Sequence, residues 1–269
     1  MLATSPTAMP RIALGLEYDG TDFVGWQIQR SGRSIEAVLA AAVQAVANEP
    51  MTVRGAGRTD AGVHAAQQVA HFDTSAERSE RQWLLGINSN LPPDVAVRWV
   101  REVPATFDAR RSAVRRRYRY SVLQQPTRPA LARARVWWIR EPLDAAAMTA
   151  ASLHWLGEHD FSAFRAAGCQ AKSPMRRLVA VRIARAAQAD GVLWQIDFTA
   201  NAFLQHMVRN LVGALVEIGR ANLTPAAAGE MLASRDRTQA AVTAPPAGLT
   251  LVEVLYPEHY RLPQLSDAD

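Results

Sequence analysis

Residues 55–64 read Gly-Ala-Gly-Arg-Thr-Asp-Ala-Gly-Val-His, and this stretch places one carboxylate, Asp60, among three glycines. Because glycine has no Cβ, it allows tight bends and a close approach of the main chain to a ligand. An aspartate is ordinarily ionised at neutral pH, and a guanidinium as near as Arg58 favours the charged form. The stretch therefore predicts a loop that presents a charged carboxylate as a nucleophile, general base or metal ligand. An ion pair within a turn is the structural alternative.

Length, composition and charge limit the classes of protein to consider. The chain has 269 residues, enough for one large domain or two lobes, and 49% of them are hydrophobic. A net charge of +5 makes nucleic acid a reasonable partner, although a modest positive charge also serves solubility alone. A single cysteine, Cys169, excludes an intrachain disulfide and fits a reducing cytoplasm. The longest apolar helical run, residues 203–218, carries charged side chains, so no membrane association is expected.

Hydrophobic periodicity divides the chain into short strands and helices. Alternating apolar residues indicate strands, and a spacing of three to four residues indicates helices. Ser34 is placed to cap one helix, and Ser79 with Gln82 forms a capping box for another. Strands are expected at 11–18, 51–53, 68–72, 95–99, 115–122, 137–139, 179–183, 194–198 and 248–256, and helices at 35–47, 80–90, 142–156, 203–219 and after 224.

The order strand, helix, strands, helix, strand occurs in each half of the chain. Asp190 and Gly191 lie between two expected strands and predict a hairpin. The fold class is therefore expected to be α/β (α+β), with two similar lobes sharing a mixed, mostly antiparallel sheet around a central cleft. The expected divisions are a tail at 1–10, an N-terminal lobe at 11–123, a connector at 124–141, a C-terminal lobe at 142–257 and a tail at 258–269.

Arginine and tyrosine alternate in the strand expected at 115–122. Tyr118 and Tyr120 would point to one face, and Arg117 and Arg119 to the other. Six arginines lie between Arg110 and Arg119, a pattern suited to neutralising phosphates and stacking on bases. A solvated edge strand protected from aggregation is the alternative.

Other catalytic patterns have little support. His154 and His159 lack the surroundings of a zinc motif, so no metal site is expected. Cys169 has no positional argument for a nucleophilic role, and no Gly-x-Ser-x-Gly motif occurs. His206 lies in the long helix, where it can face the cleft and contact substrate or be a structural histidine.

The stretch Gly57-Arg-Thr-Asp-Ala-Gly-Val-His-Ala65 resembles the active-site motif of the bacterial TruA-type tRNA pseudouridine synthases. Further stretches resemble the same family and spread over residues 12–257. At Asp108 the chain departs from the histidine found in some members. The matching stretches are Arg116-Arg-Tyr-Arg-Tyr120, His159-Asp-Phe161, Phe164-Arg165, Gly168-Cys169, Ala200–Gly213 and Gly248-Leu249.

The resemblance implies a pseudouridine synthase fold and isomerisation of uridine at positions 38, 39 and 40 of the tRNA anticodon stem-loop. This reaction is redox-neutral, so no cofactor is implied. Asp60 would attack C6 or C1′, or take the C2′ proton. Arg58 would fill the stack left by the flipped base and pair with Asp60 at rest. Tyr118 would stack on the flipped base, and Leu249 would wall the uracil pocket.

The resemblance also implies that basic side chains bind the tRNA phosphates and that the enzyme is a homodimer. A non-catalytic tRNA-binding protein and a metal-dependent RNA hydrolase are the alternatives from other classes. The side chains expected to contact RNA are Arg110, Arg111, Arg115, Arg117, Arg119, Lys172, Arg176, Arg177 and His206.

Overall fold

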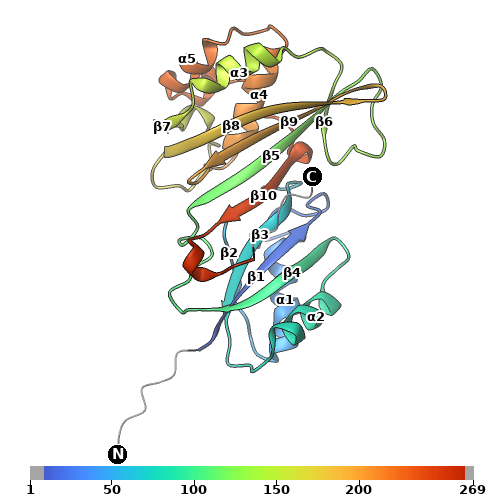
Figure 1. Cartoon of the computed structure of the whole chain (residues 1–269), viewed down its shortest axis with the longest axis vertical. Coiled ribbons are helices and arrows are strands. Elements are labelled where there is room, and N and C mark those ends of the chain that lie inside the picture. Colours follow the sequence, from blue (N-terminus) through green and yellow to red (C-terminus); the bar gives the residue numbers. More distant parts are fainter. Residues whose placement is uncertain (1–8, 264–269) are drawn as a thin grey trace, which may run out of the picture. The chain divides into compact units, whose positions relative to one another are not determined.

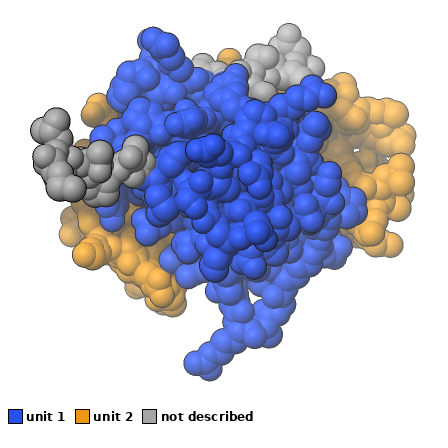
Figure 2. Space-filling view, turned by 90° about the horizontal axis from the view of Figure 1, so that it is seen from below, with its two compact units in different colours: residues 1–114, 253–269 blue, residues 115–252 orange. Residues whose placement is uncertain are grey.

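The computed structural model describes residues 9–263 (Figure 1). Most of the tail predicted at 1–10 and half of the tail predicted at 258–269 therefore lie outside the described residues. The chain divides into two compact units. Unit 1 comprises residues 1–114 and 253–269, and unit 2 comprises residues 115–252, coloured blue and orange in Figure 2. The lobe boundaries expected from the sequence, with a connector at 124–141, stay a prediction.

The sheet of unit 1 is built around β1 (Arg11–Tyr18). This strand pairs antiparallel with β3 (His64–Asp73) on one side and β4 (Val95–Val103) on the other. A short strand, β2 (Arg54–Gly55), pairs antiparallel with β3 just before the loop that carries Asp60. Since β1 has a neighbour on both edges, six of its eight residues are buried.

Two helices belong to unit 1, α1 (Ile35–Ala47) and α2 (Glu80–Asn90), which pack against each other (Figure 1). Both begin where the sequence predicts. The Ser34 side chain accepts the Ala37 N–H, and the capping box of Ser79 with Gln82 is formed. These bonds satisfy N–H groups that a helix end leaves unpaired.

The sheet of unit 2 follows the order β5 (Arg115–Gln124), β9 (Gly191–Ala200), β8 (Met175–Gln188), β7 (Gly157–Asp160), with every pair antiparallel. The strand β6 (Trp137–Ile139) pairs with β5 in parallel. The predicted α/β class with mixed, mostly antiparallel pairing is thereby confirmed. The last strand, β10 (Leu249–Leu255), runs from unit 2 into unit 1 along the chain.

The helices of unit 2 are α3 (Ala145–Leu153), α4 (Met207–Gly219) and α5 (Ala227–Ser234). The side chains of α4 are almost all buried, and α3 packs against it. Trp155 is fully buried and donates its indole N–H to the Ala228 carbonyl at 3.0 Å. Short 3₁₀ turns complete the fold at η1 (Ser162–Phe164), η2 (Arg237–Gln239), η3 (Pro246–Gly248) and η4 (Glu258–Tyr260). In residues 9–263, no helix combines the length and apolar character needed to cross a membrane.

Several predicted boundaries are wrong, each for a local reason. The strand expected at 51–53 lies instead at 54–55, where it finds its partner in β3. The helix expected from 203 begins at Met207, because His206 takes a left-handed conformation with φ of 62°. The helix expected from 142 begins at Ala145, where the Asp144 side chain caps it. β8 starts at Met175, because its early residues pair with β7, which the sequence did not reveal.

The glycine at position 213 sets how closely the chain packs on α4. A Cβ there would lie 1.8 Å from the carbonyl oxygen of Val242, a backbone atom with little room to move. We expect Gly213→Ala to lower the free energy of unfolding by about 1–3 kcal/mol through overpacking. Gly168→Ala, where a Cβ meets no atom within 4 Å, is the control and should stay within about 1 kcal/mol of wild type. Urea unfolding of both variants checks this, and equal stabilities would contradict it.

Candidate active site

The loop that carries Asp60 is fixed along its backbone by a segment from another part of unit 1. Gly25 and Asp60 form an isolated antiparallel bridge. The Trp26 N–H donates to the Thr59 carbonyl at 3.0 Å, and the Gly62 N–H donates to the Phe23 carbonyl at 3.2 Å. The loop is therefore paired with residues 23–26 much as a strand pairs with its neighbour.

Two glycines make this pairing possible. Gly25 has φ of +107°, a conformation that side chains rarely adopt, and a Cβ there would lie 2.6 Å from the Thr59 carbonyl oxygen. A Cβ on Gly55 would lie 2.4 Å from the indole ring of Trp26. Trp26 is itself buried, so the ring has nowhere to retreat. Glycine at position 25 thus permits the backbone pairing itself, and glycine at position 55 leaves room for the Trp26 ring beside it.

Side chains along the loop alternate between solvent and the interior. Arg58 is exposed, Thr59 is buried and Asp60 is half-buried. The Thr59 hydroxyl lies 2.9 Å from the Tyr18 hydroxyl, and the Gln68 amide donates to the Gly57 carbonyl at 2.7 Å. The structure therefore holds Arg58 and Asp60 on a short anchored segment, while their roles and their mutual pairing stay predictions.

Burial changes the chemistry of Tyr18. Its phenol is 3% exposed, and burial raises its pKa to about 12, partly offset by the hydrogen bonds with Thr59 and Gln68. The group is therefore neutral throughout the physiological range. Because the phenol is neutral, it keeps the proton with which it can donate a hydrogen bond in the interior.

Tyr118 lies in unit 2 on the buried face of β5. It is 8% exposed, and the ring of Phe203 meets it edge to face, with centroids 5.1 Å apart and planes at 86°. In the register of the sheet, Tyr118 lies opposite Phe198 of β9. Phe203 lies just before α4, in the turn where the sequence predicted helix. The ring of Tyr118 is therefore supported by an aromatic neighbour.

Leu249 and His206 also belong to unit 2. Leu249 is the first residue of β10 and is 5% exposed. The segment before it is held by Tyr120, whose hydroxyl donates to the Pro245 carbonyl at 2.7 Å and whose ring lies against Gly248. His206 is half-buried at the start of α4, where the Asn210 N–H donates to its carbonyl. Whether either residue contacts a substrate stays a prediction.

The basic residues expected to contact RNA fall into two groups. Arg117, Arg119 and Arg176 are half-buried and form hydrogen bonds within the protein, whereas Lys172 and the other arginines are exposed. Arg119 forms two hydrogen bonds with Asp197 at 2.8 and 2.9 Å, and Arg117 approaches the same carboxylate at 3.3 Å. Arg176 donates to the carbonyls of Ser173 and Met175. The exposed members are Arg110, Arg111, Arg115, Lys172 and Arg177.

Asp108 stabilises the turn that contains two of these arginines. One of its carboxylate oxygens accepts the backbone N–H groups of Arg110 and Arg111 at 2.9 and 2.8 Å. Burial alone would raise the pKa of Asp108, but these hydrogen bonds and neighbouring positive charge lower it overall. An ionised Asp108 therefore fixes the turn that presents Arg110 and Arg111.

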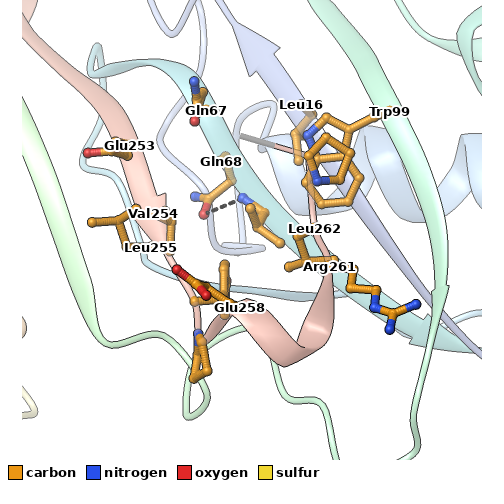
Figure 3. A pocket seen from close by; sticks show the side chains of 15 residues that line it. Leu16, Gln67, Gln68, Trp99, Glu253, Val254, Leu255, Glu258, Arg261 and Leu262 are labelled. Carbon is orange, nitrogen blue, oxygen red and sulfur yellow. Dashed lines mark hydrogen bonds between the residues drawn. The ribbon is translucent and has the colours of Figure 1, made fainter. Parts of the chain in front are cut away.

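A pocket of about 180 Å³ lies elsewhere in unit 1 (Figure 3). It is lined by residues of β1, β3 and β4 together with the segment at 253–263, and Trp99, Glu253 and Arg261 are among them. Neither Arg58 nor Asp60 lines this pocket. Among residues 9–263, no group of three or more histidine, cysteine, aspartate or glutamate side chains is placed to hold a metal ion.

Comparison with known proteins places the chain in a family. The model of a family described as tRNA pseudouridine synthase matches residues 16–110 and 151–257, which include Asp60, Leu249 and His206 but not Tyr118. The chain belongs to the tRNA pseudouridine synthase family. This match covers the Asp60 loop and the residues that anchor it.

Individual relatives are similar in sequence to this chain over almost its whole length. A protein of Nitrosococcus oceani named tRNA pseudouridine synthase A is 52% identical over 95% of this chain and 97% of its own. A protein of Klebsiella pneumoniae with the same name is 50% identical over 95% of this chain and 93% of its own. Among solved structures, one of a Cbf5-Nop10-Gar1 complex covers 90% of this chain and 49% of its own at 10% identity, and its TM-score of 0.38 is too low to support an inference.

Sequence reasoning missed four residues that shape these sites: Tyr18, Gln68, Asp197 and Phe203. A signal existed for the first two. Tyr18 follows Leu14 and Leu16 on one face of β1, and Gln68 precedes Ala70 and Phe72 on one face of β3. A polar group on such a buried face needs a partner. Their partners are 41 and 11 residues away in the chain, which no local pattern indicates.

The buried phenol of Tyr18 predicts a loss of stability at high pH. Its pKa of about 12 in the folded state exceeds the ordinary value of 10.0, so between these values the unfolded state has already lost the proton. Stability contributed by Tyr18 is therefore intact below pH 10 and falls as the pH rises towards 12. From pH 9 to pH 11 we expect wild type to lose about 1 kcal/mol more than Tyr18→Phe. Denaturant unfolding at both pH values measures this, and equal losses would refute it.

Pairing with Asp197 gives Arg119 a structural role that an exposed arginine lacks. We expect Arg119→Ala to destabilise the protein by about 1–2 kcal/mol, because it removes the two shortest side-chain hydrogen bonds to a carboxylate that is mostly buried. Arg115→Ala, at an exposed side chain that begins β5, should change stability by less than about 0.5 kcal/mol. Adding Asp197→Ala to Arg119→Ala should recover part of the loss. Unfolding curves that do not distinguish the two arginines would contradict this.

Proposed function

We propose that the protein isomerises uridine to pseudouridine in tRNA, at positions 38, 39 and 40 of the anticodon stem-loop. The observation that carries this proposal is the family match over the anchored loop with Asp60, together with 52% identity to a tRNA pseudouridine synthase A along nearly the entire chain. The three positions rest on the resemblance of its motifs to the TruA-type enzymes.

The reaction breaks the bond between C1′ and N1, turns the uracil and joins C1′ to C5. A carboxylate must stand beside the sugar and the base, and Asp60 is our candidate. It would attack C6 or C1′, or remove the C2′ proton. A half-buried position on a fixed backbone suits each of these roles, because a positioned group avoids the entropy cost of finding its target.

A uridine in a stem must leave the helix before it can react. Arg58 would take the place of the flipped base, which its exposure permits. Tyr118 would stack on the uracil and Leu249 would wall its pocket. The edge-to-face contact with Phe203 supports a fixed ring at Tyr118, as a stacking surface requires.

The tRNA would be held mainly through its phosphates. Arg110, Arg111, Arg115, Lys172 and Arg177 suit this role best, since their side chains are exposed. We propose that the enzyme acts as a homodimer in the cytoplasm, where its substrate is made and used. A particle of twice the 29.4 kDa chain mass in light scattering would support the dimer.

Replacement of the Asp60 carboxylate tests the proposed function. The protein is incubated with an unmodified tRNA transcript in EDTA, and pseudouridine is mapped by carbodiimide adducts and primer extension. Wild type should give stops at positions 38–40, and Asp60→Asn should lower the rate on the order of 10³-fold or more while still binding tRNA. Asp22→Asn, an exposed carboxylate in the neighbouring segment, is the control and should retain activity.

Two results would overturn the proposal. Binding of tRNA by wild type without any stops would indicate a binding protein that has no isomerase activity. A parallel incubation with Mg²⁺ in place of EDTA tests the other alternative, and strand cleavage that occurs only in this incubation would indicate a metal-dependent hydrolase.

A further inference from the structure

Two buried polar side chains of the unit 1 sheet form hydrogen bonds with residues of the Asp60 loop. Tyr18 ends β1 and Gln68 lies in β3. Tyr18 is 3% exposed and Gln68 is 0% exposed, so water cannot satisfy either group. Burying an amide and a phenol is costly unless both are hydrogen-bonded, and their partners are therefore informative.

The amide of Gln68 has a defined orientation. Its nitrogen donates to the Gly57 carbonyl at 2.7 Å and to the Tyr18 hydroxyl at 3.4 Å, and its oxygen accepts the Val69 N–H at 3.3 Å. Figure 3 shows Gln68 and its bond to the neighbouring backbone. The reversed orientation would set two oxygens against each other at Gly57, so this arrangement is the one that satisfies every group.

The hydroxyl of Tyr18 continues the chain of hydrogen bonds. Its oxygen accepts from Gln68, and the Thr59 hydroxyl lies 2.9 Å away. The phenol proton needs an acceptor in this buried place, and Thr59 provides one. Gln68 thus holds Gly57 directly and holds Thr59 through Tyr18.

Gly57 and Thr59 flank Arg58, and Thr59 immediately precedes Asp60. We propose that Gln68 and Tyr18 are positioning residues for the isomerisation, which set the place of Arg58 and Asp60 without touching the substrate. This inference rests on the proposed function. Since a displacement of about 1 Å at a reacting group can cost about 100-fold in rate, a loosened anchor should slow the chemical step.

Two variants remove the anchor with little change of shape. Gln68→Met keeps the length of the side chain without its donors, and Tyr18→Phe keeps the ring without its hydroxyl. Asn88→Ala is the matched control: it breaks two hydrogen bonds between α2 and the Val97 backbone in the same unit, away from the Asp60 loop.

The first measurement needs no activity. Hydrogen exchange followed by mass spectrometry compares a peptide over residues 55–64 with one over α1. Gln68→Met and Tyr18→Phe should speed exchange in the loop peptide and leave α1 unchanged, whereas Asn88→Ala should leave the loop unchanged. Unaltered exchange of the loop in both variants would overturn the anchoring.

The second measurement is the single-turnover rate on unmodified tRNA, per folded molecule, together with the affinity for that tRNA. Both variants should react about 10-fold or more slowly than wild type, with affinity changed less than about 3-fold. The double variant should be about as slow as the slower single variant, because the two residues form one chain of bonds. Asn88→Ala should match wild type in rate.

The outcomes separate this inference from the proposed function. Faster loop exchange with an unchanged rate would show that the reaction does not need the anchor, which overturns the positioning role. A wild type that forms no pseudouridine refutes the proposed function and with it the positioning role. Hydrogen exchange then still decides whether the two residues anchor the loop.

Discussion

A fully buried amide must find hydrogen-bond partners, and in unit 1 this requirement determines where the Asp60 loop runs. Gln68 is inside the sheet and reaches the carbonyl of Gly57. Its other contact, with Tyr18, extends the requirement to Thr59. Moving the loop away would leave an amide, a phenol and a carbonyl without partners, at about 1–3 kcal/mol for each buried group. The loop is therefore tied to the most buried part of its unit.

A second constraint acts on the same loop from the side. Residues 23–26 pair with it through the backbone, and glycine at position 25 lets the two segments approach. Side-chain anchors fix Gly57 and Thr59, while backbone bonds fix Thr59 and Asp60. Together they leave Arg58 exposed and Asp60 half-buried, so the charged groups are presented on rigid support. Such preorganisation is what the reaction proposed for Asp60 would require.

Much of this could be predicted from the sequence, because the signals are local. Alternation identified β1 and β5, capping residues identified α1 and α2, and the motif around Asp60 identified the family. The anchors could not be predicted, because they join residues far apart: Tyr18 and Thr59 are 41 residues apart, and Arg119 and Asp197 are 78 apart. Those partners are set by strand register, which depends on packing of the whole sheet. The predicted start of α4 was wrong for another reason. His206 adopts a left-handed backbone conformation, which the residue types around it do not indicate.

Strand β5 shows that arginines which are conspicuous in a sequence need not be available to bind phosphates. Its alternating pattern sends Tyr118 and Tyr120 to the buried face and Arg117 and Arg119 to the other. The register places Arg119 opposite Asp197 of β9. Arg117 and Arg119, which were expected to bind phosphates, both form ion pairs with this carboxylate. Phosphates would have to compete with a carboxylate already held in two-point contact. If the protein binds tRNA as proposed, its affinity should therefore depend more on exposed Arg110, Arg111 and Arg115 than on Arg117 and Arg119.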